Sequence, residues 1–208
     1  LDLCLTGSQK ALGAPPGLTL LCLNDKAWSV VERREKPVAD YFADLRRWGP
    51  VMRDPSGYFA TPPTGMILGL LEALRLIFEE GLEHRWRRHR AFSEAFRAGL
   101  DAIGLKSYPA EGYEAYTVSV AVAEVPEGLD DAELRRIMRE RHGVVIAGGL
   151  GKLKGRIIRI GHMGSVTIPD LTATMSSLEM ALKSLGYDLR LGAGVGALEE
   201  RLLTHLST

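Results

Sequence analysis

The sequence predicts an α/β protein. Two short apolar runs, residues 1–5 and 18–23, have the length and composition of β-strands, and turn-forming residues bound the second run on both sides. Helical periodicities follow as far as about residue 103. Beyond residue 104 the pattern becomes strand, helix, strand, strand, helix, which is typical of a small α+β layer. We therefore expect two domains, residues 1–104 and residues 105–208.

The composition is that of an ordinary globular protein. The chain has 208 residues, of which 46% are hydrophobic, enough for one large or two small domains. Its 26 basic residues balance 26 acidic ones, so charge gives no reason to expect nucleic acid or an anionic membrane as a partner. No apolar run has the length of a membrane span, and we find no signal peptide. We expect a cytoplasmic protein.

The two cysteines, Cys4 and Cys22, lie one in each apolar run. They have the spacing of neither a disulfide framework nor a zinc motif, and we predict that both are small apolar core residues in a reducing compartment. The chain opens in the middle of a strand pattern without a methionine, which would leave a strand edge unpaired. We therefore expect it to be the C-terminal part of a longer protein.

A loop between the two apolar runs carries the first candidate functional residue, Lys10. The loop reads TGSQKALGAPPG over residues 6–17, with glycines that permit tight turns and a Pro-Pro-Gly end that is rigid. A lysine near an apolar surface loses its proton more easily, and a neutral amine can form a Schiff base with an aldehyde. On residue type alone a solvated loop lysine is the commoner outcome.

The string GSQKALGAPPG, residues 7–17, closely resembles the lysine segment of class V aminotransferases that use pyridoxal phosphate (PLP). The alanine/serine–glyoxylate group is the nearest match, and the resemblance continues to about Leu189. It implies that Lys10 forms the Schiff base with PLP and that Gln9 helps to hold the cofactor phosphate. It also implies the PLP-dependent transferase fold of type I, here the C-terminal part of the large domain followed by a small α+β C-terminal domain. The family's glycine-bearing phosphate loop, its stacking aromatic residue and the aspartate that pairs with the pyridine nitrogen precede this segment and have no match here.

Short helices are expected after the second apolar run. Asn24 is a typical N-cap, so we predict a polar helix over residues 26–35 that Pro37 ends. Residues 40–48 carry apolar side chains on one helical face, and Gly49-Pro50 is expected to end that helix.

A loop rich in turn formers, residues 54–65, precedes a strongly periodic helix over residues 66–78. Thr61 or Thr64 can cap this helix, and a hydroxyl at the positive end of a helix suits a phosphate. On physical grounds alone, capping and packing explain Tyr58 and Thr61 as well as phosphate binding does. The class V aminotransferases carry a Tyr-x-x-Thr-x-Pro segment here. This resemblance implies that Tyr58 and Thr61 reach the PLP phosphate of the other subunit in a homodimer.

A long helix is expected from Gly81 to about Ile103, ended by Gly104. Basic and acidic residues alternate in its first half, so we favour a solvated face over a nucleic-acid patch. His84 and His89 lack the spacing that places two ligands on one helical face, and we expect no metal site. The predicted buried stripe comprises Leu82, Trp86, His89 or Arg90, Ser93, Phe96, Leu100 and Ile103.

The second half is expected to contain a strand over residues 116–122, a helix over 130–141, strands over 143–147 and 156–160, a helix over 167–185, and a last helix over 197–206 after a glycine hinge at 192–196. Arg159 lies between two isoleucines, and an arginine in such surroundings requires an anionic partner, most simply a protein carboxylate. The segment GGLG followed by a short spacer and RIG also resembles the class V aminotransferases, whose arginine holds the α-carboxylate of the substrate. This resemblance assigns that role to Arg159, and a guanidinium suits it because it can hold a carboxylate with two parallel hydrogen bonds.

The resemblance implies transamination between alanine or serine and glyoxylate or pyruvate, with PLP as electron sink and Lys10 as the base that moves the α-proton. Two other functions stay open. Cysteine desulfurases share the fold but need a mobile loop cysteine, which Cys4 and Cys22 do not supply. A degenerate relative would serve as a non-catalytic binding subunit. A phosphate-binding P-loop is excluded, because no Gly-Lys-Ser/Thr is present.

Overall fold

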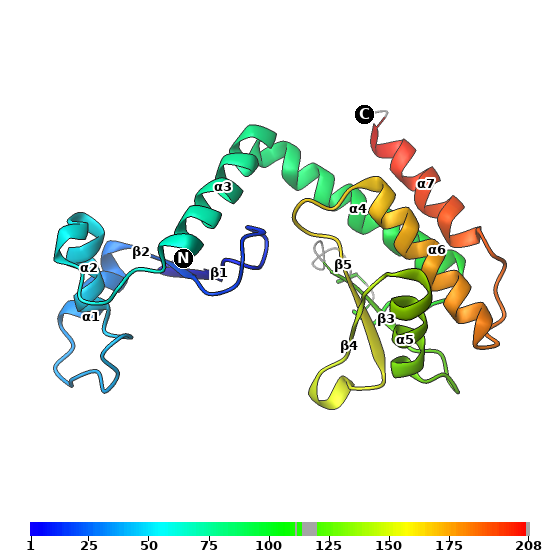
Figure 1. The fold of residues 1–208 in the computed structure, drawn as a ribbon, viewed down its shortest axis with the longest axis horizontal. Helices are drawn as coiled ribbons and strands as arrows, with labels where there is room; N and C mark the ends of the chain where they lie inside the picture. Colours follow the sequence, from blue (N-terminus) through cyan, green and yellow to red (C-terminus); the bar gives the residue numbers. More distant parts are fainter. Residues whose placement is uncertain (111, 114–119, 207–208) are drawn as a thin grey trace. The chain divides into compact units, whose positions relative to one another are not determined.

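The structure is a computed structural model that describes residues 1–110, 112–113 and 120–206. The chain divides into two compact units, residues 1–79 and residues 80–208, each of which is described by itself (Figure 1). This division precedes the long helix, whereas the sequence places a domain boundary after it. The boundary after residue 104 stays a prediction. Within the described residues, no helix combines the length and hydropathy that a membrane span requires.

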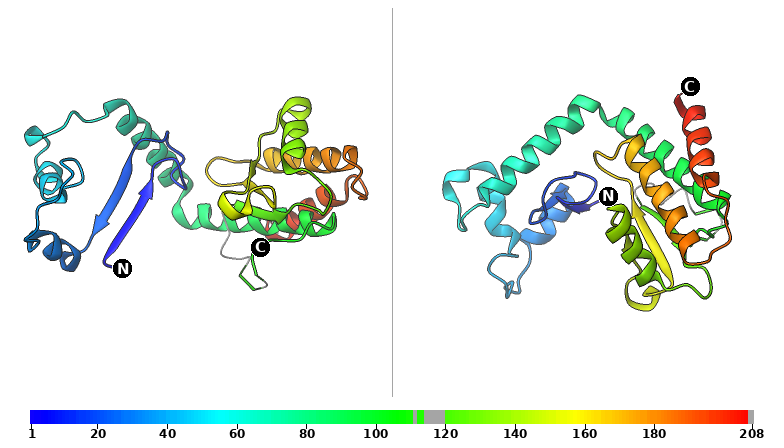
Figure 2. Two further views of the ribbon diagram at one scale, coloured as in Figure 1. Left: turned by 90° about the horizontal axis from the view of Figure 1, so that it is seen from below. Right: turned by 45° about the vertical axis from the view of Figure 1, so that its right-hand side comes forward.

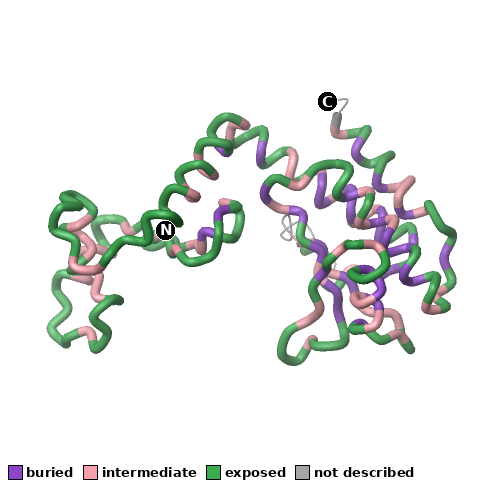
Figure 3. Tube along the Cα trace, viewed as in Figure 1, coloured by how far each residue is buried: buried purple, intermediate pink, exposed green. Residues whose placement is uncertain are grey.

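The first unit begins with an antiparallel hairpin. Strand β1 (Leu3–Gly7) pairs with strand β2 (Thr19–Leu23), so that Cys4 lies opposite Cys22. Both strands were predicted, but their predicted burial is wrong for this chain. Leu5 is 62% exposed, and both cysteines are exposed (Figure 3). A hairpin of two strands buries little surface by itself.

The remaining elements of the first unit are α1 (Asp25–Glu32), α2 (Leu45–Arg53), the short 3-10 helix η1 (Pro55–Gly57) and α3 (Thr64–Glu80). The predicted cap of α1 is confirmed, because the Asn24 side chain accepts the Ala27 N–H at 2.9 Å. The predicted end of the next helix is wrong, since α2 continues through Gly49 and Pro50. A Cβ on Gly49 would lie 2.6 Å from the Trp28 indole, so this glycine permits close packing rather than a stop.

Helix α3 has no threonine cap. The Pro63 carbonyl accepts its first backbone N–H groups, from Met66 at 2.9 Å and Ile67 at 3.1 Å. The Thr61 and Thr64 hydroxyls accept none of them among the described residues. The alternative that either threonine caps this helix is therefore wrong, and the Thr61 side chain is left for other contacts.

The second unit contains α4 (Leu82–Ala102), β3 (Val120–Glu124), α5 (Asp131–His142), β4 (Ala147–Gly148), the 3-10 helix η3 (Gly151–Leu153), β5 (Ile157–Gly161), α6 (Ile168–Ser184) and α7 (Ala193–Leu206). Its described strands form an antiparallel sheet in the order β3-β5-β4, so β5 is central. Helix α7 lies along α4 and α6 (Figure 2). The N-terminal part of the strand predicted over 116–122, residues 116–119, lies outside the described residues.

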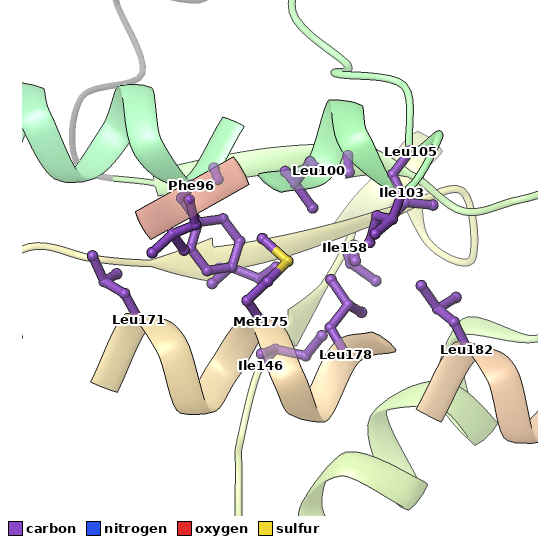
Figure 4. Packing of buried hydrophobic residues seen from close by; sticks show 14 of the residues in the cluster. Phe96, Leu100, Ile103, Leu105, Ile146, Ile158, Leu171, Met175, Leu178 and Leu182 are labelled. Atoms are coloured by element: carbon purple, nitrogen blue, oxygen red, sulfur yellow. The ribbon is translucent and has the colours of Figure 1, made fainter. Parts of the chain in front are cut away.

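The core lies in the second unit, where side chains from α4, the sheet and α6 meet (Figure 4). Phe96 of α4, Ile158 of β5 and Met175 of α6 are each at most 1% exposed. The buried stripe predicted on α4 is correct from Ser93 onward but wrong at its start, because Leu82 is 45% and Trp86 is 65% exposed.

The predicted glycine hinge before the last helix is wrong. Helix α7 begins at Ala193 and includes Gly194 and Gly196. The buried Glu179 carboxylate of α6 accepts the N–H groups of Gly192 and Gly194 at 2.6 Å each, and the Val195 N–H at 3.3 Å. These bonds satisfy the free N–H groups of the first turn and place a negative charge at the positive end of the helix.

Candidate functional site

Lys10 lies in the loop between β1 and β2. Its side chain is exposed, and its amine forms no hydrogen bond or ion pair with any residue that the structure describes. The expected apolar floor is absent in this chain, because the flanking strands are exposed. The Lys10 main chain is fixed: its N–H donates to the Gly7 carbonyl at 3.1 Å, and its carbonyl accepts the Gly13 N–H at 2.9 Å. The loop backbone therefore fixes the point from which the Lys10 side chain projects.

Gln9 precedes the lysine and is exposed. A Cβ on Gly7 would lie 2.6 Å from Oε1 of Gln9, so the carboxamide lies over the glycine backbone. A side chain at position 7 would therefore require the exposed Gln9 side chain to shift. The carboxamide carries two N–H donors, which are suited to a phosphate oxygen.

Tyr58 and Thr61 lie on the segment between η1 and α3, in the same unit as the lysine loop. Both side chains are exposed, Tyr58 by 59%. Neither hydroxyl forms a hydrogen bond within the described residues. The pair is thus available to an external phosphate oxygen.

An aromatic cluster holds this segment at Phe59, between the two candidate residues. The Phe59 ring contacts Trp48 edge-on with centroids 4.8 Å apart and Tyr41 edge-on at 5.5 Å. The Arg47 guanidinium lies 4.0 Å from the centroid of the Tyr41 ring. Edge-to-face pairs and cation–π contacts are directional, so the cluster restrains the main chain next to Tyr58.

Helix α3 connects the two candidate loops of the first unit. The Met66 side chain occupies the space where a Cβ on Gly17 would lie, and a Cβ on Gly69 would lie 3.4 Å from Pro15. The Pro-Pro-Gly end of the lysine loop therefore packs on α3, which begins at Thr64, three residues after Thr61.

Arg159 lies in the middle of β5, opposite Ala147 of β4. Its Nε donates to the Gly148 carbonyl at 2.8 Å. No carboxylate among the described residues pairs with it, so the protein carboxylate considered from the sequence is absent there. The bond at Nε orients the guanidinium and leaves its two terminal nitrogens for a carboxylate, which they can hold with two parallel hydrogen bonds.

The sequence did not indicate a polar network, made of hydrogen bonds and ion pairs, that joins α4 to the segment following β5. Arg88 donates to the Gly164 carbonyl at 2.9 Å and to the Val166 carbonyl at 3.2 Å. His89 Nε2 accepts the Gly164 N–H at 3.1 Å. Because Nε2 is an acceptor, Nδ1 carries the proton and donates to the Arg85 carbonyl at 2.8 Å. Burial, reinforced by the nearby arginine charges, lowers the His89 pKa, which keeps the ring neutral.

Glu80 belongs to the same polar network, in which it pairs with two arginines of α4. Its carboxylate accepts from Arg88 Nε at 2.6 Å and from Arg85 at 2.8 Å. The Arg88 guanidinium, with a smaller contribution from Arg85, lowers the pKa of Glu80 to about 2. The solvated face predicted for this part of α4 is therefore wrong at Arg85 and Arg88, whereas the half-buried His89 agrees with its alternative place in the buried stripe. Gly164 and Val166 are more than 70 residues from α4 in the sequence, and helical spacing carries no signal for such contacts.

The structure thus brings four of the five predicted site residues, Gln9, Lys10, Tyr58 and Thr61, into the first unit, and places Arg159 in the second. The side chains fit PLP chemically. An unpaired amine suits an aldehyde, unpaired hydroxyls and a carboxamide suit a phosphate, and an oriented guanidinium suits a substrate carboxylate.

Comparison with known proteins decides the family. The family model described as "Aminotransferase class-V" matches residues 1–189. The chain belongs to the class V aminotransferase family. The end of the match agrees with the point near Leu189 at which the sequence resemblance ends.

Curated relatives place the chain in the serine/alanine–glyoxylate group. An uncharacterized aminotransferase of Methanocaldococcus jannaschii is 38% identical over 203 residues, which are 98% of this chain and 52% of the relative. The serine–glyoxylate aminotransferase of Arabidopsis thaliana is 34% identical, covering 99% of this chain and 50% of the relative. A protein of Synechococcus sp. named soluble hydrogenase, small subunit, is 35% identical, covering 98% and 52%. The chain therefore spans about half the length of these relatives.

Solved structures show the same fold. The ureidoglycine–glyoxylate aminotransferase of Bacillus subtilis superposes with a TM-score of 0.91 at 29% identity, covering 97% of this chain and 52% of that one. The alanine–glyoxylate aminotransferase of Nostoc sp. superposes with a TM-score of 0.82 at 31% identity, covering 88% and 48%. The chain has the α/β fold of type I PLP-dependent transferases over about half of their length.

Proposed function

We propose that the protein containing this chain is a PLP-dependent aminotransferase that transfers the amino group of alanine or serine to glyoxylate or pyruvate. Membership of the class V family carries this proposal. It is supported by the free amine of Lys10 and by the oriented guanidinium of Arg159. Glyoxylate is the acceptor in the names of the Arabidopsis, Bacillus and Nostoc proteins, whereas the donor differs among them. We also propose a cytoplasmic location.

Each residue has a defined task in this proposal. PLP, when bound, withdraws electrons from the substrate α-carbon. Nζ of Lys10 would hold the cofactor aldehyde, and as a free amine it would take and return the α-proton of the substrate as a general base. The two terminal nitrogens of Arg159 hold the substrate carboxylate, which orients the α-carbon.

We further propose that the enzyme is a homodimer in which Gln9 binds the cofactor phosphate of its own subunit while Tyr58 and Thr61 bind that of the partner. The unpaired hydroxyls of Tyr58 and Thr61 support this assignment. The test uses the whole protein that the gene encodes, called the gene-encoded protein below. Substituting Tyr58 by Phe and Thr61 by Val in it should raise the Kd for PLP by roughly tenfold for each charge-assisted hydrogen bond lost. An unchanged PLP affinity in both variants would contradict the assignment.

Arg159 offers the sharpest test of the substrate class. In the gene-encoded protein, Arg159→Gln should lower kcat/KM for alanine, serine and glyoxylate by roughly ten- to a hundredfold, the effect of losing a hydrogen bond between charged groups. Arg156→Gln is the matched control, because Arg156 is an exposed arginine that directly precedes β5, three residues before Arg159. Equal kinetics in the two variants would contradict the carboxylate clamp.

A non-catalytic role is the second candidate, and the relative named as a hydrogenase subunit favours it. A cysteine desulfurase is disfavoured, because Cys4 and Cys22 lie opposite each other within paired strands and not on a loop. Assays of the gene-encoded protein with alanine and glyoxylate separate the candidates. Turnover supports the aminotransferase, and its absence in PLP-loaded protein favours the non-catalytic subunit.

A further inference from the structure

Ser8 is the one fully buried polar residue in residues 1–79, all of which the structure describes. It lies at the base of the lysine loop, two residues before Lys10. Its side chain is 0% exposed, although most of the surrounding loop and both strands are exposed. Burial of a single hydroxyl in an open unit requires a specific reason.

Four hydrogen bonds give that reason. Oγ of Ser8 donates to the Pro15 carbonyl at 2.6 Å and accepts the Leu18 N–H at 3.3 Å. Its main-chain N–H donates to the Leu18 carbonyl at 3.0 Å, and its carbonyl accepts the Ala14 N–H at 3.0 Å. One residue therefore joins the start of the loop to three residues of its far end.

Lys10 lies inside the turn that these bonds close. Its own main-chain bonds reach only Gly7 and Gly13, which are themselves part of the loop. The far end of the loop is in addition packed on α3 through Pro15 and Gly17. Ser8 is thus the connection between the lysine turn and the part of the loop that is anchored on a helix.

We propose that Ser8 is a positioning residue for Lys10: its hydroxyl fixes the loop so that the amine is presented to the cofactor aldehyde. This inference rests on the proposed function. Loss of the hydroxyl removes the partner of the Pro15 carbonyl and of the Leu18 N–H, which are only partly buried, so the loop can shift to let water take the place of the hydroxyl. A displacement of about 1 Å is enough to cost a large factor in reactivity.

The test compares Ser8→Ala with Ser29→Ala in the gene-encoded protein. Ser29 is the matched control: its hydroxyl also donates to one main-chain carbonyl, of Lys26 at 2.8 Å, and accepts one hydrogen bond, from Arg33, but it lies on α1. Cofactor-free protein is mixed with PLP and reduced with borohydride after increasing times. The adducts on Lys10 and on the exposed Lys26 are then quantified by mass. Hydrogen exchange of the segment 10–18 is recorded on the same samples.

In the wild-type protein and in Ser29→Ala, Lys10 should react faster than Lys26. In Ser8→Ala we expect the Lys10 rate to fall by roughly ten- to a hundredfold while the Lys26 rate is unchanged. The amides of segment 10–18 should exchange at least about tenfold faster. Ser8→Thr, which keeps a hydroxyl, should recover part of the Lys10 rate.

Two results would overturn the proposal, one by refuting the role of Ser8 alone and the other by refuting the proposed function. If Ser8→Ala melts at a lower temperature but keeps the selective reaction of Lys10 well below that temperature, Ser8 is structural only. If the wild-type protein itself shows no preference for Lys10 over Lys26, the proposed function fails, and the inference about Ser8 fails with it.

Discussion

His162 is fully buried, and neither of its ring nitrogens has a hydrogen-bond partner among the described residues. It stacks on Phe96 with ring centroids 6.4 Å apart. Burial, with a smaller contribution from the charge of Arg97, lowers the pKa of His162 to about 4. An unfolded histidine has a pKa of about 6.5, so the folded state favours the neutral ring.

This shift predicts a pH dependence of stability. The unfolded chain binds a proton at His162 as the pH falls below about 6.5, whereas the folded chain does so only near pH 4. The contribution is therefore complete above about pH 6.5 and declines as the pH falls, by about 3 kcal/mol in total. His162→Phe, which keeps a ring against Phe96, should flatten the change in Tm between about pH 7.5 and about pH 5. The exposed His84→Gln is the control, and parallel pH profiles for wild type and His162→Phe would contradict the argument.

At the residue scale, the sequence was informative where a function depends on a short string. The segment GSQKALGAPPG pointed to Lys10 and Gln9, and RIG pointed to Arg159, but their roles stay predictions. Ser8 was not singled out, because its partners lie across the loop at Pro15 and Leu18. Neutral imidazole at His89 likewise depends on Gly164 of a distant segment.

Helix ends show the same contrast at the scale of elements. The caps at Asn24 and Asp130 were predictable, because each side chain bonds to an N–H within three residues. The continuation of α2 through Gly49-Pro50 and the early start of α7 were not, because they depend on Trp28 and Glu179 of other helices. Glycine signals a stop by conformational freedom and close packing by its lack of a Cβ, and sequence alone does not separate the two.

Two glycines of α7 make this distinction measurable. A Cβ on Gly194 would lie 2.9 Å from the Gly99 carbonyl and from the Glu179 carboxylate, whereas one on Gly196 would meet nothing within 4 Å. Gly194→Ala should destabilise the protein by about 1–3 kcal/mol through overpacking. Gly196→Ala should stabilise it by about 0.5–1 kcal/mol, the helix preference of alanine over glycine. Thermal unfolding of both variants decides the matter, and equal shifts in Tm would contradict the close crossing of α4 and α7.

The aromatic cluster at Phe59 also acts as an element, because it links α2 to the Tyr58–Thr61 segment. Phe59→Ala removes the ring contacts with Trp48 and Tyr41, so it should raise the Kd for PLP by about tenfold if Tyr58 and Thr61 hold the phosphate. Phe59→Tyr preserves an aromatic ring and is the control. A PLP affinity unchanged in Phe59→Ala would show that the cluster does not restrain these residues.

At the scale of the whole molecule, the two units differ in how much apolar surface they bury. The second unit has a closed core, whereas the first leaves Leu5, Leu71 and Phe78 at least 62% exposed (Figure 3). Helix α3 is apolar on several sides, a pattern typical of a helix that is covered all round. The sequence predicted the elements of the first unit but not this exposure. An apolar run indicates that a segment is buried, but it does not show which other segment buries it.

The 208-residue chain alone is therefore expected neither to fold tightly nor to transaminate. The amides of β1 and β2 should exchange much faster than those of α6, because exchange protection follows burial and contact density. A dye that fluoresces on apolar surfaces should bind the isolated chain and mark the exposed surface of the first unit. Normal turnover by a preparation whose mass is that of 208 residues would refute this expectation.

The central claim is that Lys10 is the residue that carries PLP. The most direct measurement incubates the gene-encoded protein with PLP, reduces it with borohydride, and locates the modified peptide by mass, with the intact mass recorded alongside. We predict one pyridoxyl adduct per chain, on Lys10, which a Lys10→Arg variant abolishes. Full-length protein that carries no adduct at Lys10, or carries it on another lysine, would contradict the aminotransferase account.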